Sequence, residues 1–187
     1  MKLVLVAGIV VVIVGGVMMW MNNNQMPTDT QINIQSTENA IPDSRTEEEK
    51  VIASWYAPLT SFTFGRISLQ ASIADTDAER AQGLSGTPYI PIGIAKVFIF
   101  DSAQQWSFWM KDMNYPIDIF WLDEIGRVVH VVENASPDSY PEFSFVPPVP
   151  AKYVIETKAG FAKENNIGVG ASADVAPFER ARAKLDN

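Results

Sequence analysis

The chain has 187 residues, of which 47% are hydrophobic and 19% charged, so it is long enough to bury one sizeable core. Its formal net charge of −8 argues against a nucleic-acid partner, because binding a phosphate backbone requires a cationic surface. The absence of Cys excludes disulfides and Cys-ligated metal centres, and a single His excludes a multi-histidine site, so we expect no cofactor and no metal.

An uncharged hydrophobic segment of 19 residues occupies positions 3–21. As a helix it would cover about 28 Å, close to the thickness of a bilayer's hydrocarbon core. It ends in bulky Met and Trp side chains, which favours an uncleaved anchor over a cleaved secretory signal. We expect residues 1–21 to be a single-pass transmembrane anchor in the cell membrane. Lys2 is the cation before this segment and Arg45 is the next one, so the positive-inside rule places the remaining chain outside the cytoplasm.

Residues 22–50 are rich in Asn, Gln, Thr, Ser and Glu and nearly free of large apolar side chains. Such a segment buries too little surface to offset its ordering entropy, so we expect a flexible polar linker. Residues 51–187 contain short β-branched and aromatic runs separated by Pro, Gly, Asn and Asp, and they form the expected globular domain.

Within this domain the apolar runs predict strands more than helices. Strands are expected at residues 67–71, 96–100, 106–110, 117–122, 127–132, 153–157 and 171–176. A turn over residues 123–126 joins two of them into a hairpin, since Gly126 permits positive φ. Short helices are expected at residues 75–82, 159–165 and 177–185. The predicted fold class is mainly β, a small sandwich or barrel with one to three short helices.

Several motifs follow one another in a characteristic order. They are DTDAERAQGL from residue 75, KVFIF from 96, FWMKD from 108, PIDI from 116, GRVV from 126, ENA from 133 and PAKYVIE from 150. In this order the chain resembles the uncharacterised prokaryotic family called domain of unknown function 192, over residues 67–175. The resemblance implies a small mainly β domain, often behind a signal peptide or anchor, with no agreed biochemical activity.

Six residues are candidates for a ligand pocket of mixed aromatic and charged character: Trp109, Lys111, Asp118, Glu133, Lys152 and Glu156. Trp109 and Lys111 share one face of the predicted strand over residues 106–110. Asp118 and Glu156 lie within apolar runs, and buried carboxylates are costly unless paired, so we expect Lys111 or Lys152 as their partner. A structural ion pair at the mouth of the sheet is the alternative interpretation.

We assign no catalytic residue. His130 lies in a valine strand without an adjacent acid, and no serine nucleophile motif is present. A carboxylate-based hydrolase acting on an envelope or polysaccharide substrate stays open, if two of Asp118, Glu133 and Glu156 face each other at about 5–10 Å. The aromatic residues between positions 106 and 121 would then stack on sugar rings, or they belong to the core.

Residues 134–150 contain five prolines and are expected to form a long loop, either a lid over the pocket or a strap along a sheet edge. Our first hypothesis is a membrane-tethered extracytoplasmic binding or accessory domain for an unknown small polar ligand or envelope component. The other hypotheses are the hydrolase and a protein-interaction module that uses the proline-rich loop.

Overall fold

The computed structural model describes residues 45–185, so the predicted anchor over residues 1–21 and nearly all of the linker lie outside the described residues. Within the described range no helix is long and apolar enough to cross a membrane. The first described helix, α1 (Glu47–Val51), begins at the end of the predicted linker. Thr46 and Glu49 form a capping box at its start, and the π-helical turn η1 (Ile52–Tyr56) follows directly.

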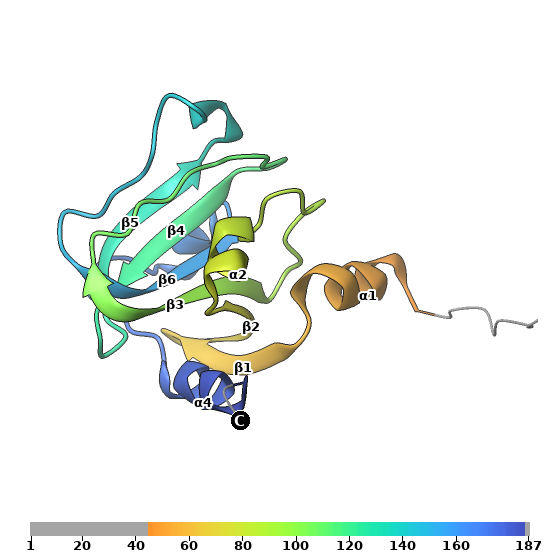
Figure 1. The fold of residues 1–187 in the computed structure, drawn as a ribbon, viewed down its shortest axis with the longest axis horizontal. Coiled ribbons are helices and arrows are strands. Elements are labelled where there is room, and N and C mark those ends of the chain that lie inside the picture. Colours follow the sequence, from red (N-terminus) through yellow and green to blue (C-terminus); the bar gives the residue numbers. More distant parts are fainter. Residues whose placement is uncertain (1–44, 186–187) are drawn as a thin grey trace, which may run out of the picture. The chain divides into compact units, whose positions relative to one another are not determined.

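Six strands form one sheet in the order β1-β2-β3-β6-β4-β5 (Figure 1). Their bounds are β1 (Leu59–Phe64), β2 (Ile67–Ala74), β3 (Ile94–Gln104), β4 (Ile117–Leu122), β5 (Val128–Ala135) and β6 (Ala151–Lys158). Neighbouring strands are antiparallel, except that β2 and β3 run parallel. The short helices are α2 (Asp77–Gln82), α3 (Phe161–Asn165), α4 (Ala176–Leu185) and the 3-10 turn η2 (Pro137–Ser139). The prediction of a mainly β domain with few short helices is confirmed.

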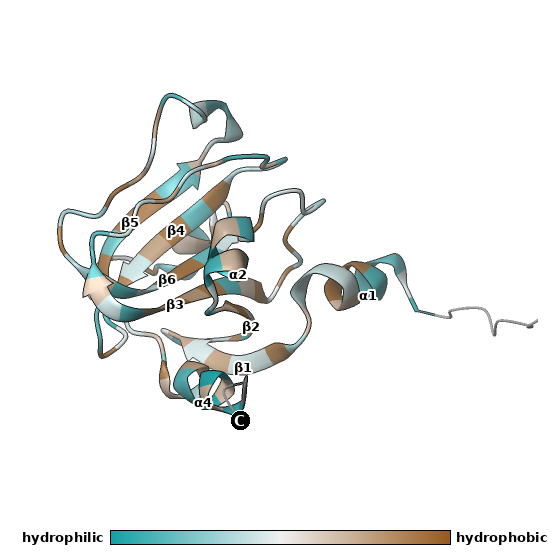
Figure 2. Ribbon diagram, in the orientation of Figure 1, coloured by the Kyte–Doolittle hydropathy of each residue, from teal (hydrophilic) through white to brown (hydrophobic). Residues whose placement is uncertain are grey.

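Both faces of the sheet carry a hydrophobic core. Alternation along β6 sends Tyr153 and Ile155 into one cluster and Val154 into the other. The central strands are therefore buried along nearly their whole length, as the continuous burial of β4 illustrates. Figure 2 shows the corresponding hydrophobic residues along the strands. A polar side chain that points to either face here is enclosed by apolar neighbours.

Residues 170–174 connect two strands that lie at opposite edges of the sheet order. The backbone N–H of Val128 donates to the Ala171 carbonyl over 2.8 Å, at the start of β5. The backbone N–H of Gly65 donates to the Ser172 carbonyl over 2.8 Å, just beyond the end of β1. This short segment thus provides hydrogen-bond partners for backbone groups at both edges of the sheet. Covering an edge in this way is a common protection of sheet edges.

Gly126 lies where this connecting segment comes closest to the hairpin turn. Its φ is +81°, and a Cβ there would lie 2.4 Å from the Ala173 carbonyl oxygen. We expect Gly126→Ala to lower the free energy of unfolding by at least about 2 kcal/mol, because left-handed strain adds to a backbone clash. Urea unfolding would measure this loss. Gly170→Ala is the matched control, since its φ is +91° but no atom lies within 4 Å of the added Cβ. Equal losses in the two variants would contradict a role for the close approach.

The local predictions agree with the structure in most elements and fail in two. The hairpin of β4 and β5 and the three helices are present at the predicted places, with Thr76 as the cap of α2. The predicted strand over residues 106–110 is wrong, because only Phe108 pairs there, with Phe145, in an isolated bridge. The predicted last strand is likewise reduced to bridges at Ser172 and Ala173 before α4 begins. Strand β1 was not predicted, since its Thr and Ser residues weaken the apolar signal.

Candidate functional site

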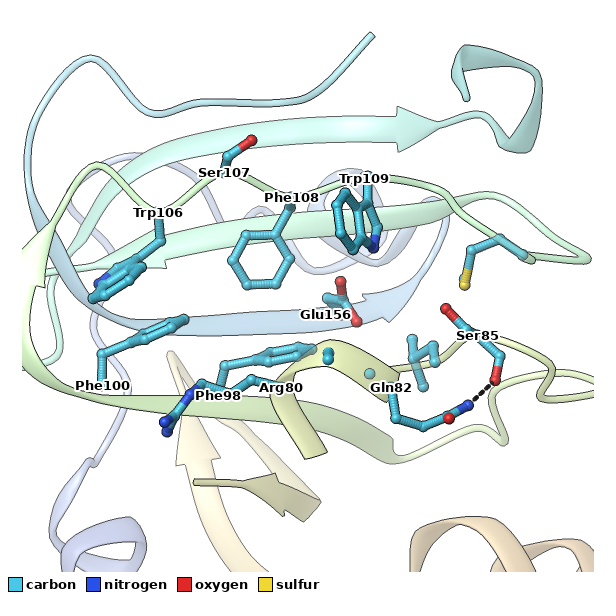
Figure 3. Close-up of a pocket in the computed structure, with 14 residues that line it drawn as sticks. Arg80, Gln82, Ser85, Phe98, Phe100, Trp106, Ser107, Phe108, Trp109 and Glu156 are labelled. Carbon is cyan, nitrogen blue, oxygen red and sulfur yellow. Dashed lines mark hydrogen bonds between the residues drawn. The ribbon is translucent and has the colours of Figure 1, made fainter. Parts of the chain in front are cut away.

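A cavity of about 230 Å³ lies between helix α2 and the extended segment 106–109, above strands β3 and β6 (Figure 3). Five aromatic side chains line it, together with smaller apolar and polar ones. The apolar lining side chains are Ala81, Leu84, Phe98, Phe100, Trp106, Phe108, Trp109 and Met113, and the polar ones are Arg80, Gln82, Ser85, Ser107 and Glu156. The combination of apolar walls with few polar groups is typical of small-molecule sites.

Aromatic side chains from the two sides of the cavity contact one another at its wall. The rings of Phe100 and Trp106 stack with centroids 4.0 Å apart and an interplanar angle of 11°. Phe98 and Phe108 meet edge to face at 4.8 Å. Figure 3 shows these two pairs, with Phe98 and Phe100 rising from β3 and Trp106 and Phe108 descending from the facing segment. Such contacts fix the wall before any ligand arrives.

The proline-rich loop holds that facing segment from behind. Phe108 and Phe145 exchange two backbone hydrogen bonds of 2.9 and 2.8 Å, and Gln105 donates to the Pro147 carbonyl over 3.0 Å. The indole N–H of Trp121 on β4 donates to the Trp106 carbonyl over 3.0 Å. The loop therefore braces the aromatic wall, as a strap would.

Helix α2 lies on the opposite side of the cavity, where contacts with β3 hold it in place. Gly83 ends the helix with φ +50°, and a Cβ there would lie 3.2 Å from the Phe98 ring. Arg80 donates to the Ile99 carbonyl over 2.8 Å and lies 5.4 Å from the centre of the Phe100 ring. The helix thus contacts β3 through both Arg80 and Gly83.

Glu156 provides the carboxyl group of the cavity. It projects from β6, opposite Lys96 of β3 and Ile119 of β4, and its side chain is only 4% exposed. Figure 3 shows the carboxyl between the Trp109 ring and helix α2. In the described part of the chain the atom Oε2 is buried and has no hydrogen-bond partner. Trp106 also lines the cavity, and its Nε1 is likewise buried without a hydrogen-bond partner in the described structure.

The electrostatic environment keeps this carboxyl neutral near pH 7. Burial raises the pKa of Glu156 to about 8, and the Lys96 ammonium opposes part of that rise. Burial also lowers the pKa of Lys96, and the negative charges of Glu156 and Glu79 oppose this lowering. A protonated carboxyl has one donor and retains acceptor capacity, so it can pair with either kind of group.

Asp118 does not reach this cavity, and its partner is not a lysine. Its side chain is fully buried, and its two oxygens accept the backbone N–H groups of Asn134 and Ala162, each over 2.8 Å. The expected pairing with Lys111 or Lys152 is therefore wrong for this residue. Asp118 instead joins the end of β5 to the start of helix α3.

The other predicted site residues lie in different places. Trp109, 52% exposed, lines the cavity, whereas Lys111 lies in an exposed turn beside it. Glu133 is exposed on edge strand β5. Lys152 forms an ion pair with Glu179 of α4 over 3.2 Å. The structure thus brings together Trp109 and Glu156, and the partner that the sequence interpretation missed is Lys96. The sequence could have indicated Lys96, because it begins the KVFIF run and lies on the same strand face as Phe98.

Within residues 45–185, neither a pair of carboxylates nor a metal-binding cluster forms around Glu156. Glu156 is the one carboxylate among the residues that line the cavity in the described structure, so the two-carboxylate arrangement of a hydrolase is missing there. Across residues 45–185 no group of three or more His, Cys, Asp or Glu side chains is placed to hold a metal ion.

This geometry defines a class of protein: a small mainly β domain with a buried carboxyl in an aromatic pocket. Residues 60–175 match the family DUF192, described as "Uncharacterized ACR", and the chain belongs to this family. The predicted family membership is confirmed, and the match also includes nearly all of β1. No functionally curated protein matches the chain.

Two solved structures are similar to this one. A protein of unknown function from Novosphingobium aromaticivorans DSM 12444 is 26% identical, with a TM-score of 0.58 over 62% of this chain and 84% of that one. A putative transcription regulator from Sinorhizobium meliloti 1021 is 23% identical, with a TM-score of 0.57 over 62% of this chain and 91% of that one. The second likeness concerns the fold alone.

Proposed function

We propose that the chain is a membrane-tethered extracytoplasmic binding domain whose cavity between α2 and residues 106–109 holds a small neutral ligand. The observation that carries the proposal is Glu156, a buried carboxyl without a hydrogen bond in the described structure, set in an aromatic cavity. An unsatisfied buried polar group costs about 1–3 kcal/mol, and a ligand that forms hydrogen bonds with the Glu156 carboxyl would remove this cost. The tether rests on the uncharged apolar segment over residues 3–21.

The cavity restricts the chemistry of this ligand. A volume of about 230 Å³ is below that of typical drug-sized pockets and suits one or two rings. Flat aromatic walls favour a planar ligand, and a neutral carboxyl favours an amide, a lactam or a ring edge that carries a donor next to an acceptor. Arg80 at the wall and Lys96 beside Glu156 disfavour a cationic ligand. A neutral, planar, polar molecule fits best.

Ligand binding to Glu156 variants tests the proposal. A library of neutral lactams, amides and heteroaromatic rings is added to the full chain, and the thermal midpoint and NMR shifts are recorded. We expect to find ligands whose affinity falls about tenfold in Glu156→Leu, which loses the hydrogen bonds. Their affinity should fall far less in Glu156→Gln, which retains a donor and an acceptor. Glu133→Gln is the control for loss of a carboxylate outside the cavity. Binding that is unchanged in Glu156→Leu, or no ligand at all, would contradict the proposal.

A further inference from the structure

A second and larger cavity, of about 670 Å³, lies beside edge strand β1. Its lining comes from η1, from strands β1 and β2, from Lys96 of β3 and from helix α4, which Figure 1 shows next to β1. Helix α2 contributes Glu79 here and Arg80 to the aromatic cavity, so it borders both. The two cavities nevertheless differ in charge.

Positive charge predominates in this second cavity, although the chain as a whole carries −8. Its cations are Lys96, Arg180 and Lys184, against the single acid Glu79. The Glu79 carboxylate is already engaged, because its Oε2 accepts from the backbone N–H of Thr76 at 3.1 Å and from its hydroxyl at 2.9 Å. Its single negative charge is smaller than the charge of the three cations, so the lining keeps a net positive charge.

Helix α4 shows a contrast between its two sides. Glu179 pairs with Lys152, and Arg182 pairs with Asp101. Arg180 and Lys184, one helical turn apart on the side that faces the cavity, form no ion pair with any other residue of the described range. Like charges at this spacing destabilise a helix, and a shared anion would remove that cost.

Lys96 lies at the inner end of the cavity with unused hydrogen-bonding capacity. Its side chain is 8% exposed, and its Nζ donates to Ser72 Oγ over 3.2 Å. An ammonium group has three donors, so one weak partner leaves it undersatisfied. Glu156 on the next strand does not neutralise Lys96 fully, because burial favours the protonated carboxyl.

We propose that this second cavity binds an anionic group, a phosphate or a carboxylate, between Lys96 at its inner end and Arg180 and Lys184 on α4. Charge-assisted hydrogen bonds from these cations stabilise such a group. The indole of Trp55, 44% exposed, and the side chains of Leu59 and Ile73 give the cavity an apolar wall. The ligand therefore carries its anionic group on an apolar body, and it is distinct from the neutral ligand of the aromatic cavity.

The test uses the purified full chain in neutral detergent, with phenyl phosphate and benzoate as probes. We expect these probes to raise the thermal midpoint and to bind about tenfold more weakly to Lys96→Met, which removes the inner cation while keeping an apolar side chain of similar length. Lys163→Met, at an exposed position of α3, is the matched control and should bind like the unchanged chain. Arg180→Gln and Lys184→Gln, both at exposed positions of α4, should each weaken binding several-fold, and they replace Lys96→Met in the test if that variant does not fold.

A second arm identifies the source of the anion. Monomeric dihexanoyl phosphatidylglycerol is compared with the neutral dihexanoyl phosphatidylcholine. A phosphatidylglycerol affinity well above that of phenyl phosphate, and dependent on Lys96, supports the site and assigns it to a lipid headgroup. The reverse order supports the site and assigns it to a soluble anion. Absence of binding by all anionic probes, or binding that Lys96→Met and the α4 variants leave unchanged, overturns the proposal. Neither outcome depends on Glu156→Leu, so failure here is separable from failure in the aromatic cavity.

Discussion

Replacement of Glu156 by Gln is expected to stabilise the domain, by an amount that grows with pH. The native state holds the Glu156 proton up to about pH 8, whereas an unfolded chain releases it near the ordinary value of 4.5. The unchanged chain therefore loses stability as pH rises from 4.5 to 8, because its unfolded state has already lost the proton. Glutamine has no proton to lose, so the gain is near zero below pH 4.5 and reaches at most roughly 5 kcal/mol above pH 8.

Urea unfolding at pH 4.5, 6.5 and 9 measures this effect as the difference between the variant and the unchanged chain. Taking the difference removes the contribution of the other titrating groups, which the two proteins share. Glu133→Gln, at an exposed position of β5, is the matched control for loss of a carboxylate outside the cavity. If the free energy of unfolding of Glu156→Gln differs from that of the unchanged chain by the same amount at all three pH values, the carboxyl titrates normally. The conclusion that Glu156 is neutral in the native state would then be wrong.

Local chemistry explains which elements were predictable. The hairpin of β4 and β5 follows from a turn whose Gly126 accepts φ +81°, and helix α2 follows from a capping box and Gly83. Both signals act over a few residues. The aromatic run over residues 106–110 has the composition of a strand, yet it covers the sheet instead of joining it, since only Phe108 pairs. Tertiary packing decided that case.

The candidate site was predictable only in part, because strand order brings its members together. Glu156 and Lys96 are opposite one another since β6 inserts between β3 and β4, an arrangement that no local pattern reveals. The sequence did indicate that Glu156 and Asp118 lie within apolar strands and need partners. It did not indicate that one would remain without a hydrogen bond while the other would be fully satisfied by backbone amides.

Asp118→Ala is expected to be the most destabilising of the single changes considered. The carboxylate is fully buried and accepts the backbone N–H groups of Asn134 and Ala162, each over 2.8 Å. Alanine leaves both donors without their acceptor, and each unsatisfied donor costs about 1–3 kcal/mol, so the free energy of unfolding should fall by roughly 3–5 kcal/mol. Asp118→Asn should lower the free energy of unfolding by less than Asp118→Ala does. Its amide retains one acceptor oxygen, but it turns an N–H₂ donor toward the other backbone donor.

Urea unfolding gives the loss, and hydrogen exchange shows where it arises. The amide protons of Asn134 and Ala162 should exchange much faster in Asp118→Asn, since their bonds hold the end of β5 and the first turn of α3 in place. Asp138→Asn, in the exposed turn η2, removes a carboxylate without these bonds and should change stability little. A loss below about 1 kcal/mol for Asp118→Ala would show that water replaces the carboxylate, and the stabilising role assigned to Asp118 would then be wrong.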